Sequence, residues 1–151
     1  MKLNSKTCLI YSPGGHFFEL KKCIEGLILT NCYHVTFESK RNTKIKNFYV
    51  IEHPNKSIIK TIINLFQSIK ILIKEKPKFI ITTGADVAVP TFLVGKILFN
   101  TKNIFIESIG NFDRPTLTGR ICYYFSDIFL IQFKKLKKIY PKAILAKGLI
   151  H

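Results

Sequence analysis

The sequence TCLIYSPGGHFFELKK, residues 7–22, decides the fold of this chain. It opens with a short apolar run, TCLIYS, that is typical of a buried β-strand. A glycine pair follows, and then Phe17 and Leu20 recur at the spacing of an amphipathic helix. Because glycine has no Cβ, such a pair lets the backbone pass close to another group. The stretch therefore predicts a strand, a tight turn and a helix with free N–H groups in its first turn.

The alternation of apolar strands and helices continues to the end of the chain. We expect further strands at residues 33–39, 47–53, 79–84, 103–108, 127–132 and 142–148. Helices are expected at residues 16–29, 56–76, 87–99, 115–125 and 133–140. Strands that are apolar on both faces and alternate with helices indicate a parallel sheet covered on both sides. The predicted fold is a Rossmann-like α/β sheet, in one domain that spans residues 1–151.

Three polar turns follow strands of this predicted sheet. They are SPGGH at 12–16, TTGADV at 82–87 and ESIGNFDRPTLTG at 107–119. Ligands of such sheets bind in the crevice at the carboxyl ends of the strands, and in a parallel sheet these ends share one edge. We therefore expect all three turns to open on the same edge and to form the functional site.

The SPGGH turn is suited to a phosphate. Gly14 and Gly15 expose backbone N–H groups at the start of a helix, whose dipole favours anions. The alternative is a tight turn in which the glycines serve geometry alone. The turn does not complete a G-x-G-x-x-G fingerprint, because His16 and Glu19 follow where glycines would stand, although Glu38 lies where a ribose-binding acid would.

His16 is the most informative single residue of this turn. A helix dipole disfavours a positive charge near the helix N-terminus, and a neutral imidazole keeps a nitrogen free to accept a proton or contact a hydroxyl. We predict a catalytic base or an acceptor contact at His16. The alternative is a residue that only bonds to local backbone at the helix start.

Carboxylates follow the fourth and fifth predicted strands. Asp86 and Glu107 can orient a sugar hydroxyl or act as bases, but Asp86 can instead cap the helix that begins at Val87, and Glu107 can be structural. The candidate catalytic residues are His16 and Glu107, and the candidate acceptor- or phosphate-binding residues are Ser12, Gly14, Gly15, Gly84, Asp86, Thr116 and Thr118. The sequence predicts no metal site and no cofactor, since no Cys/His pair has the spacing of zinc ligands.

The net charge of +15 predicts an acidic partner, which can be nucleic acid, an anionic membrane surface or a phosphorylated substrate. A/T-biased coding is an alternative source of the charge, because the chain is rich in Lys, Ile and Asn and its only arginines are Arg41, Arg114 and Arg120. Lysine recognises bases less well than arginine does, and no strand resembles an RNA-recognition motif. We therefore expect no nucleic acid among the partners.

The sequence also limits where the protein acts. The start, MKLNSKTCLIYS, lacks the pattern of a secretory signal. The longest apolar run, residues 87–99, contains Pro90 and Lys96 and is shorter than the roughly 20 residues that cross a bilayer. The spacing of Cys8, Cys23, Cys32 and Cys122 is typical of unpaired thiols in a reducing cytoplasm.

Four motifs together resemble a known family. SPGGHFFEL, ITTGADVAVP, FIESIGNFDRPTLTGR and YPKAI occur in this order along nearly the whole chain. In order and spacing they are similar to PssD/CpsF-type glycosyltransferase subunits of bacterial capsule and exopolysaccharide synthesis. They are also similar to the acceptor-side, membrane-anchoring subunit of the eukaryotic dolichol-linked N-acetylglucosaminyltransferase. More remotely, the chain resembles the N-terminal half of the glycosyltransferase that completes the lipid-linked peptidoglycan precursor.

This resemblance implies a GT-B architecture of two Rossmann-like halves, of which the chain is the acceptor-side half. It implies that a separate partner subunit carries the nucleotide-sugar pocket, and that the chain alone is inactive or weakly active. Eukaryotic members carry an N-terminal membrane anchor that is not found here, so we expect peripheral attachment. The segment GNFDRP varies in the family, which leaves Asp113 and Arg114 without an assigned role.

The sequence-based hypothesis is an acceptor-binding subunit of a two-component hexosyltransferase in capsule or exopolysaccharide biosynthesis. It would add a sugar from a nucleotide sugar to a polyprenyl-diphosphate-linked saccharide at the cytoplasmic face of the membrane. His16, or Glu107 as a rival base, would activate the acceptor hydroxyl. Two alternatives stay open: a nucleotide-binding oxidoreductase that uses SPGGH with Glu38, and a basic nucleic-acid-binding module.

The predicted helix at 56–76 is the candidate for membrane contact. Its core-facing side is expected to hold Ile58, Ile62, Leu65, Phe66, Ile69, Leu72 and Ile73. Lys60, Lys70 and Lys74 flank that side, and Ile59, Ile63 and Ile71 widen it beyond what one core contact needs. Such a helix can lie in a membrane interface. The alternative is a helix packed on the sheet with a solvated lysine edge.

Overall fold

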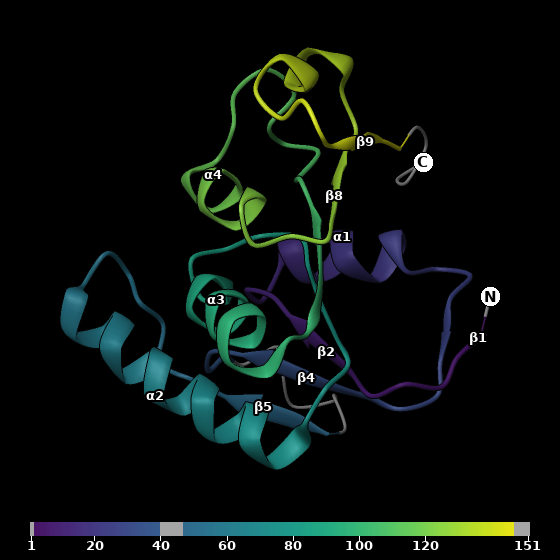
Figure 1. Ribbon diagram of the computed structural model, residues 1–151. Coiled ribbons are helices and arrows are strands. Elements are labelled where there is room, and N and C mark those ends of the chain that lie inside the picture. The colour runs from purple at the N-terminus through teal and green to yellow at the C-terminus, as the bar shows by residue number, and fades with distance from the viewer. Residues whose placement is uncertain (1, 40–46, 147–151) are drawn as a thin grey trace.

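Seven parallel strands form the central sheet of the computed structural model, which describes residues 2–39 and 47–146 (Figure 1). Their order across the sheet is β5-β4-β2-β6-β7-β8-β9. The strands are β2 (Thr7–Ile10), β4 (Cys32–Thr36), β5 (Phe48–Val50), β6 (Phe79–Thr82), β7 (Lys102–Ile106), β8 (Ile128–Ile131) and β9 (Ile144–Leu145). The chain starts in the middle of the sheet at β2, builds outward to β5, and then returns to β6 on the other side of β2. This switch point between β2 and β6 is where Rossmann-like sheets bind ligands.

Helices cover both faces of the sheet, as the sequence predicted. They are α1 (Gly15–Cys23), α2 (Ile58–Glu75), α3 (Ala88–Phe99), α4 (Leu117–Tyr123) and the 3-10 helix η2 (Lys134–Lys138). Helix α1 lies on one side of the sheet, and α2, α3 and α4 lie on the other (Figure 1). The larger core, under α2, α3 and α4, includes Phe92, Phe105 and Phe129. A smaller core under α1 includes Leu9, Leu20 and Ile81.

The structure corrects the predicted end of the first helix. A helix was expected to run to residue 29, but α1 ends at Cys23, and Gly26 follows in a left-handed conformation with φ of 91°. The chain then forms β3 (Ile28–Leu29), which pairs with β1 (Lys2–Leu3) in a small second sheet. Leu27 and Ile28 matched helical spacing, but a glycine with positive φ breaks the helix before them.

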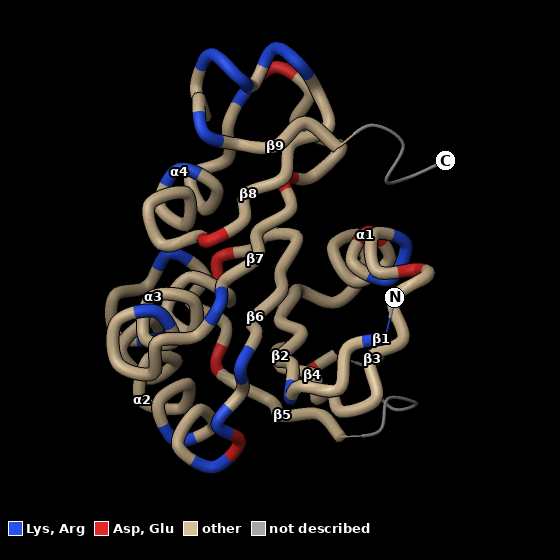
Figure 2. The backbone as a smooth tube through the Cα atoms, turned by 45° about the vertical axis from the view of Figure 1, so that its right-hand side comes forward, with Lys and Arg blue, Asp and Glu red and all other residues tan. Residues whose placement is uncertain are grey.

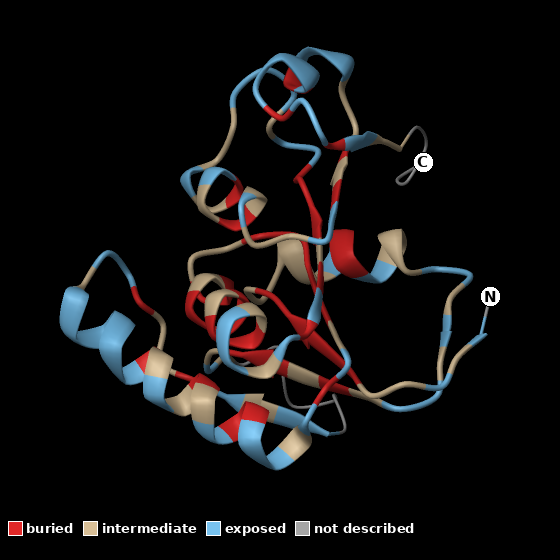
Figure 3. Ribbon diagram, viewed as in Figure 1, coloured by how far each residue is buried: buried red, intermediate tan, exposed pale blue. Residues whose placement is uncertain are grey.

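Helix α2 does not dock as its hydrophobic pattern predicted. Ile58, Ile62, Phe66 and Ile73 were expected in the core but are exposed, whereas Ile71 is buried. Figure 3 shows the N-terminal half of α2 as mainly exposed. The buried side of α2 carries Asn64, Ser68, Ile71 and Leu72.

Buried polar groups attach α2 to α3. The Asn64 amide donates to the carbonyl of Glu52 at 2.7 Å and to that of Val87 at 3.4 Å, and the Ser68 and Thr91 hydroxyls lie 2.7 Å apart. These bonds satisfy groups that would be costly to bury alone. With these polar groups and Leu72 on the buried side of α2, only part of the predicted apolar stripe packs on the core, and the rest faces solvent.

Candidate functional site

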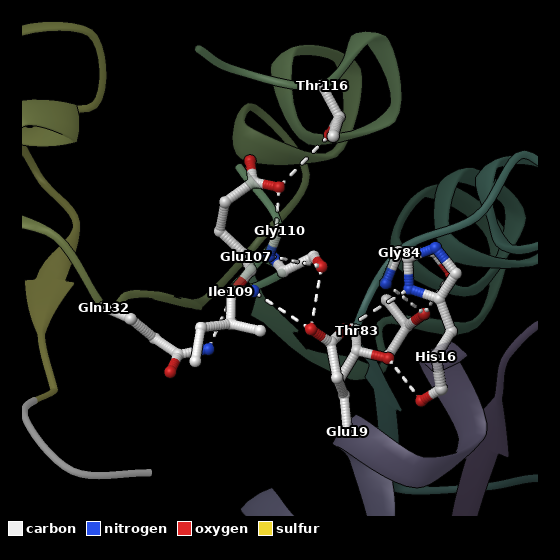
Figure 4. A network of polar contacts seen from close by, with 11 residues as sticks. His16, Glu19, Thr83, Gly84, Glu107, Ile109, Gly110, Thr116 and Gln132 are labelled. Carbon is white, nitrogen blue, oxygen red and sulfur yellow. Dashed lines mark hydrogen bonds and ion pairs between the residues drawn. The ribbon is translucent and has the colours of Figure 1, made fainter. Parts of the chain in front are cut away.

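The three polar turns lie at one edge of the sheet, as predicted. They follow β2, β6 and β7, and these three strands are neighbours with parallel pairing. Figure 4 shows residues of all three turns in one network of polar contacts. The structure therefore brings His16, Gly84 and Glu107 into one region, although the sequence separates them widely.

Two residues of the turn after β6 hold His16 in place. The Thr83 hydroxyl donates to the His16 carbonyl at 2.9 Å. Gly84 has φ of 109°, and a Cβ on it would lie 3.5 Å from Cε1 of the His16 ring, so the turn after β6 packs directly against the imidazole. The His16 side chain is 31% exposed, while its Nδ1 atom is buried. Nε2 is therefore the ring nitrogen that can meet a substrate.

Glu19, one helical turn after His16, was not singled out by the sequence analysis. It is 9% exposed. Its Oε1 accepts hydrogen bonds from the Ser108 hydroxyl at 2.8 Å and from the Ile109 N–H at 3.0 Å, and its Oε2 lies 3.6 Å from His16 Nδ1. Burial alone would raise the pKa of Glu19, but the nearby His16 imidazole and the hydrogen bonds from Ser108 and Ile109 hold it below the usual value of 4.5. The i, i+3 spacing of His16 and Glu19 was the signal that could have revealed this pair.

Glu107 is a buried carboxyl group surrounded by donors. It is 1% exposed. Its Oε1 accepts from the Ser108 N–H and the Thr116 hydroxyl, each at 3.2 Å, and its Oε2 accepts from the Tyr140 hydroxyl at 3.1 Å. Burial raises the pKa of Glu107, and the hydrogen bonds from Tyr140, Ser108 and Thr116 oppose that effect. With both oxygens bonded inside the protein, Glu107 organises the loop between β7 and α4.

The threonines of that loop differ in role. Thr116 is the N-cap of α4: its hydroxyl accepts from the Gly119 N–H at 2.8 Å while it donates to Glu107. Thr118, also a candidate, lies in the first turn of α4 and is partly buried. A Cβ on Gly119 would lie 2.2 Å from Glu107 Oε2, so only glycine fits there.

The glycine turn leaves open space at the start of α1. Gly14 is the N-cap, with φ of 102°, and no side chain caps the helix. A Cβ on Gly15 would have no atom within 4 Å. Ser12, the remaining candidate in this turn, is partly buried at the end of the β2 run. The arrangement can present backbone N–H groups to an anion.

Asp86 does not cap α3, contrary to one sequence-based alternative. The N-cap of α3 is Val87, without a side-chain hydrogen bond. Asp86 instead lies 2.9 Å from His53 Nε2 and accepts from the Asn55 N–H at 3.2 Å. The His53 ring stacks on Phe37. Asp86 therefore joins the loop before α2 to the turn after β6, and within the described residues its hydrogen bonds go to His53 and Asn55 and not to His16.

A shallow hollow of about 280 Å³ lies beside this group. Its lining includes Glu38, His53 and Gln67. Across residues 2–39 and 47–146, no cluster of three or more His, Cys, Asp or Glu side chains is arranged to hold a metal ion. None of the helices in these same ranges combines the length and the apolar character needed to cross a membrane.

Comparison with known proteins identifies the family. The family model described as "Oligosaccharide biosynthesis protein Alg14 like" matches residues 37–149. The chain belongs to the Alg14 family. Among curated Alg14 proteins, the UDP-N-acetylglucosamine transferase subunit ALG14 of Yarrowia lipolytica is 25% identical over 170 residues, which cover 93% of this chain and 79% of that protein. The Alg14 assignment confirms the resemblance to the subunit of the eukaryotic dolichol-linked N-acetylglucosaminyltransferase that the sequence motifs indicated.

Solved structures confirm the predicted fold. A UDP-GlcNAc 2-epimerase from Methanocaldococcus jannaschii superimposes with a TM-score of 0.71 at 13% identity, over 95% of this chain and 46% of its own. MurG from Acinetobacter baumannii superimposes with a TM-score of 0.68 at 14% identity, over 87% of this chain and 42% of its own. The Alg14-family chain thus shares a Rossmann-like fold with part of each of these proteins and spans less than half of their length.

Proposed function

We propose that this chain is the acceptor-binding subunit of a heteromeric glycosyltransferase. The observation that carries the proposal is the Alg14 family match across residues 37–149. The curated relatives are named UDP-N-acetylglucosamine transferase subunits, which supports UDP-GlcNAc as the sugar donor. The acceptor in this proposal is a polyprenyl-diphosphate-linked saccharide.

The second half of the enzyme is proposed to be a separate subunit. The chain corresponds to 46% and 42% of the two solved GT-B proteins compared above. A GT-B enzyme needs a nucleotide-sugar site as well as an acceptor site, and the proposed partner supplies it. Residues 1–151 then act as one acceptor-side domain that is inactive or weakly active alone.

The chemistry proposed for this subunit centres on His16. Nε2 takes the proton of the acceptor hydroxyl as that oxygen attacks the anomeric carbon and the nucleoside diphosphate leaves toward the partner. The buried, fully bonded carboxyl of Glu107 supports His16 over Glu107 as the base, with Glu107 and Thr116 shaping the loop. The N–H groups at Gly14 and Gly15 would bind the acceptor diphosphate, beside Ser12 and Gly84.

Attachment to the cytoplasmic face of the membrane is proposed to run through α2. Its N-terminal half exposes Ile58, Ile59, Ile62, Ile63 and Phe66. An apolar face of this width next to lysines is typical of helices that lie in a membrane interface. Lys and Arg are also found around η2 at the far end of the molecule, so net charge alone does not select the contacting surface (Figure 2).

The biosynthetic context is a finer proposal. Capsule or exopolysaccharide synthesis remains our expectation from the bacterial PssD/CpsF-type resemblance, whereas the matched family description names oligosaccharide biosynthesis. No contact described here favours the oxidoreductase or nucleic-acid alternatives. Measurable NAD(P) binding would support the first, and steep salt-dependent binding to DNA or RNA would support the second.

Reconstitution with the partner tests the proposed function. The chain is purified alone and after co-expression with a nucleotide-sugar-binding subunit, and each sample receives radiolabelled UDP-GlcNAc and a short-chain polyprenyl-diphosphate-linked monosaccharide. Transfer is expected only from the co-expressed pair. Robust transfer by the chain alone, or none by the stable pair with any nucleotide sugar, would contradict the proposal.

A further inference from the structure

The Glu19 carboxylate has an asymmetric environment. Oε1 is held by two donors from the turn after β7, the Ser108 hydroxyl and the Ile109 N–H. Oε2 is buried without a hydrogen bond and faces His16 Nδ1 at 3.6 Å. The fixed Oε1 therefore determines where Oε2 lies, and the atom it meets is the buried nitrogen of the imidazole.

Nδ1 of His16 is itself buried without a hydrogen-bond partner. Buried polar atoms in native proteins are almost always paired. A separation of 3.6 Å is longer than a hydrogen bond, but contacts of this kind shorten when a substrate orders the site. Two orphaned atoms that face each other in this way fit an Nδ1–H group and a carboxylate oxygen.

We propose that Glu19 is a positioning residue that keeps His16 in the Nδ1–H tautomer. This inference rests on the proposed function of His16. With the proton on Nδ1, the lone pair is on Nε2, the nitrogen that can meet the acceptor hydroxyl. When Nε2 accepts the proton of that hydroxyl, the Glu19 charge stabilises the resulting imidazolium.

The same contact couples His16 to the turn after β7. The Ser108 hydroxyl donates a hydrogen bond to Glu19, and the Ser108 N–H donates one to Glu107. Both carboxyl groups thus bind Ser108, and a shift of Ser108 would move Glu19 and with it the contact to the imidazole. Glu19, rather than Glu107, is the carboxylate that acts on the proposed base.

Glu19→Gln tests this role sharply. The amide oxygen of glutamine can keep both bonds to Ser108 and Ile109, which turns the amide NH₂ toward Nδ1. That group donates, so the ring must accept at Nδ1 and carry its proton on Nε2, the wrong tautomer for a base. The bonds from Ser108 and Ile109 survive in this variant. If Glu19 only held that loop in place, Glu19→Gln would therefore have the tautomer and turnover of wild type.

Two readouts follow, on the full chain and on the reconstituted pair. In ¹⁵N NMR spectra at a pH where the ring is neutral, His16 should be the Nδ1–H tautomer in wild type and the Nε2–H tautomer in Glu19→Gln. Turnover of the pair should fall roughly 100-fold or more, the scale of general-base catalysis. Glu25→Gln, which removes an exposed carboxylate paired with Lys22, is the matched control and should change neither readout.

The outcomes separate this inference from the proposed function. An Nε2–H tautomer in the wild-type chain overturns the role of Glu19, even if Glu19→Gln does not fold. Full activity of a folded Glu19→Gln also overturns it, provided that His16→Ala is inactive. Full activity of His16→Ala instead removes the base role of His16 in the proposed function.

Discussion

The Tyr140 hydroxyl donates a 3.1 Å hydrogen bond to Oε2 of Glu107, linking the segment after η2 to the carboxyl end of β7. The chain separates these residues widely, and both are at most 1% exposed. Together with bonds from Ser108 and Thr116, this contact makes Glu107 the centre of a buried network under α4. Two predictions about stability follow from it.

Glu107 should make stability fall as pH rises. Its pKa is higher in the folded chain than the usual value of 4.5 because it is buried. Between these two values the folded chain binds more protons, so the contribution of Glu107 to the free energy of unfolding decreases with pH. We expect the difference in unfolding free energy, wild type minus Glu107→Gln, to be smaller at about pH 7 than at about pH 4.

Denaturant unfolding at a series of pH values measures this difference. Glu19→Gln is a control of opposite sign, because the pKa of Glu19 is lowered and its contribution is lost as pH falls below 4.5. A wild-type advantage over Glu107→Gln that grows with pH would show that the Glu107 charge is stabilised rather than penalised by its surroundings.

Gly119→Ala should destabilise the chain although it lies in a helix. Alanine at an exposed helix position would gain about 1 kcal/mol over glycine. Here, however, a Cβ would meet Glu107 at 2.2 Å and both Thr116 and Tyr140 at 2.8 Å. Overpacking of a buried site typically costs about 1–3 kcal/mol, so we expect a net loss of stability in thermal or denaturant unfolding.

Gly15→Ala is the matched control for that variant. It also changes a helical glycine, but no atom lies within 4 Å of the added Cβ. It should leave the unfolding free energy unchanged or slightly raised. Equal stability of the two variants would mean that the network around Glu107 gives way to a methyl group without cost.

The sequence could predict that the three polar turns share one edge, because the strands before them belong to one parallel sheet. Apolar strands followed by polar turns suffice to collect His16, Gly84 and Glu107 at one edge. What the sequence did not reveal is which carboxylate meets which donor. That depends on side chains converging from separate turns, as when Ser108 and Ile109 close on Glu19.

The sequence predicted the wrong buried side for α2, and the physical reason is the position of its polar residues. Periodicity counts apolar residues and assumes that they face the core. In α2, Asn64 and Ser68 lie beside that stripe on the buried side of the helix and bind Glu52, Val87 and Thr91. Polar residues are usually scored as exposed, so a helix that docks through hydrogen bonds is rotated wrongly by any pattern of hydrophobicity.

His16→Ala should reduce turnover of the reconstituted pair by roughly 100-fold or more, as expected for loss of a general base. Folding and partner binding should be unaffected, since the ring is partly exposed and the bond from Thr83 is to the backbone carbonyl. His53→Ala is the control and should keep wild-type turnover. The ring that it removes is bonded to Asp86 and stacked on Phe37, not to the proposed base. A folded His16→Ala pair with wild-type turnover would exclude the proposed base.

Membrane binding through α2 should require both its apolar face and its lysines. Flotation with anionic and neutral vesicles, at low and high salt, separates the apolar contribution to binding from the electrostatic one. We expect wild type to float best with anionic vesicles at low salt. The triple variant Lys60, Lys70, Lys74→Glu should lose the preference for anionic lipid, although Lys60 also pairs with Glu52 and Lys74 lies over the Tyr49 ring.

The apolar contribution calls for a second variant on the same helix. Ile59, Ile63 and Phe66 are exposed in the N-terminal half of α2, and replacing all three by Ser should reduce flotation at high salt as well, where charge is screened. Ile97 and Leu98, equally exposed near the end of α3, provide the matched control and should tolerate the same change. If the α3 variant loses lipid binding and the α2 variant keeps it, the membrane contacts α3. If neither variant loses lipid binding and wild-type flotation does not depend on lipid charge, this chain reaches the membrane only through its partner.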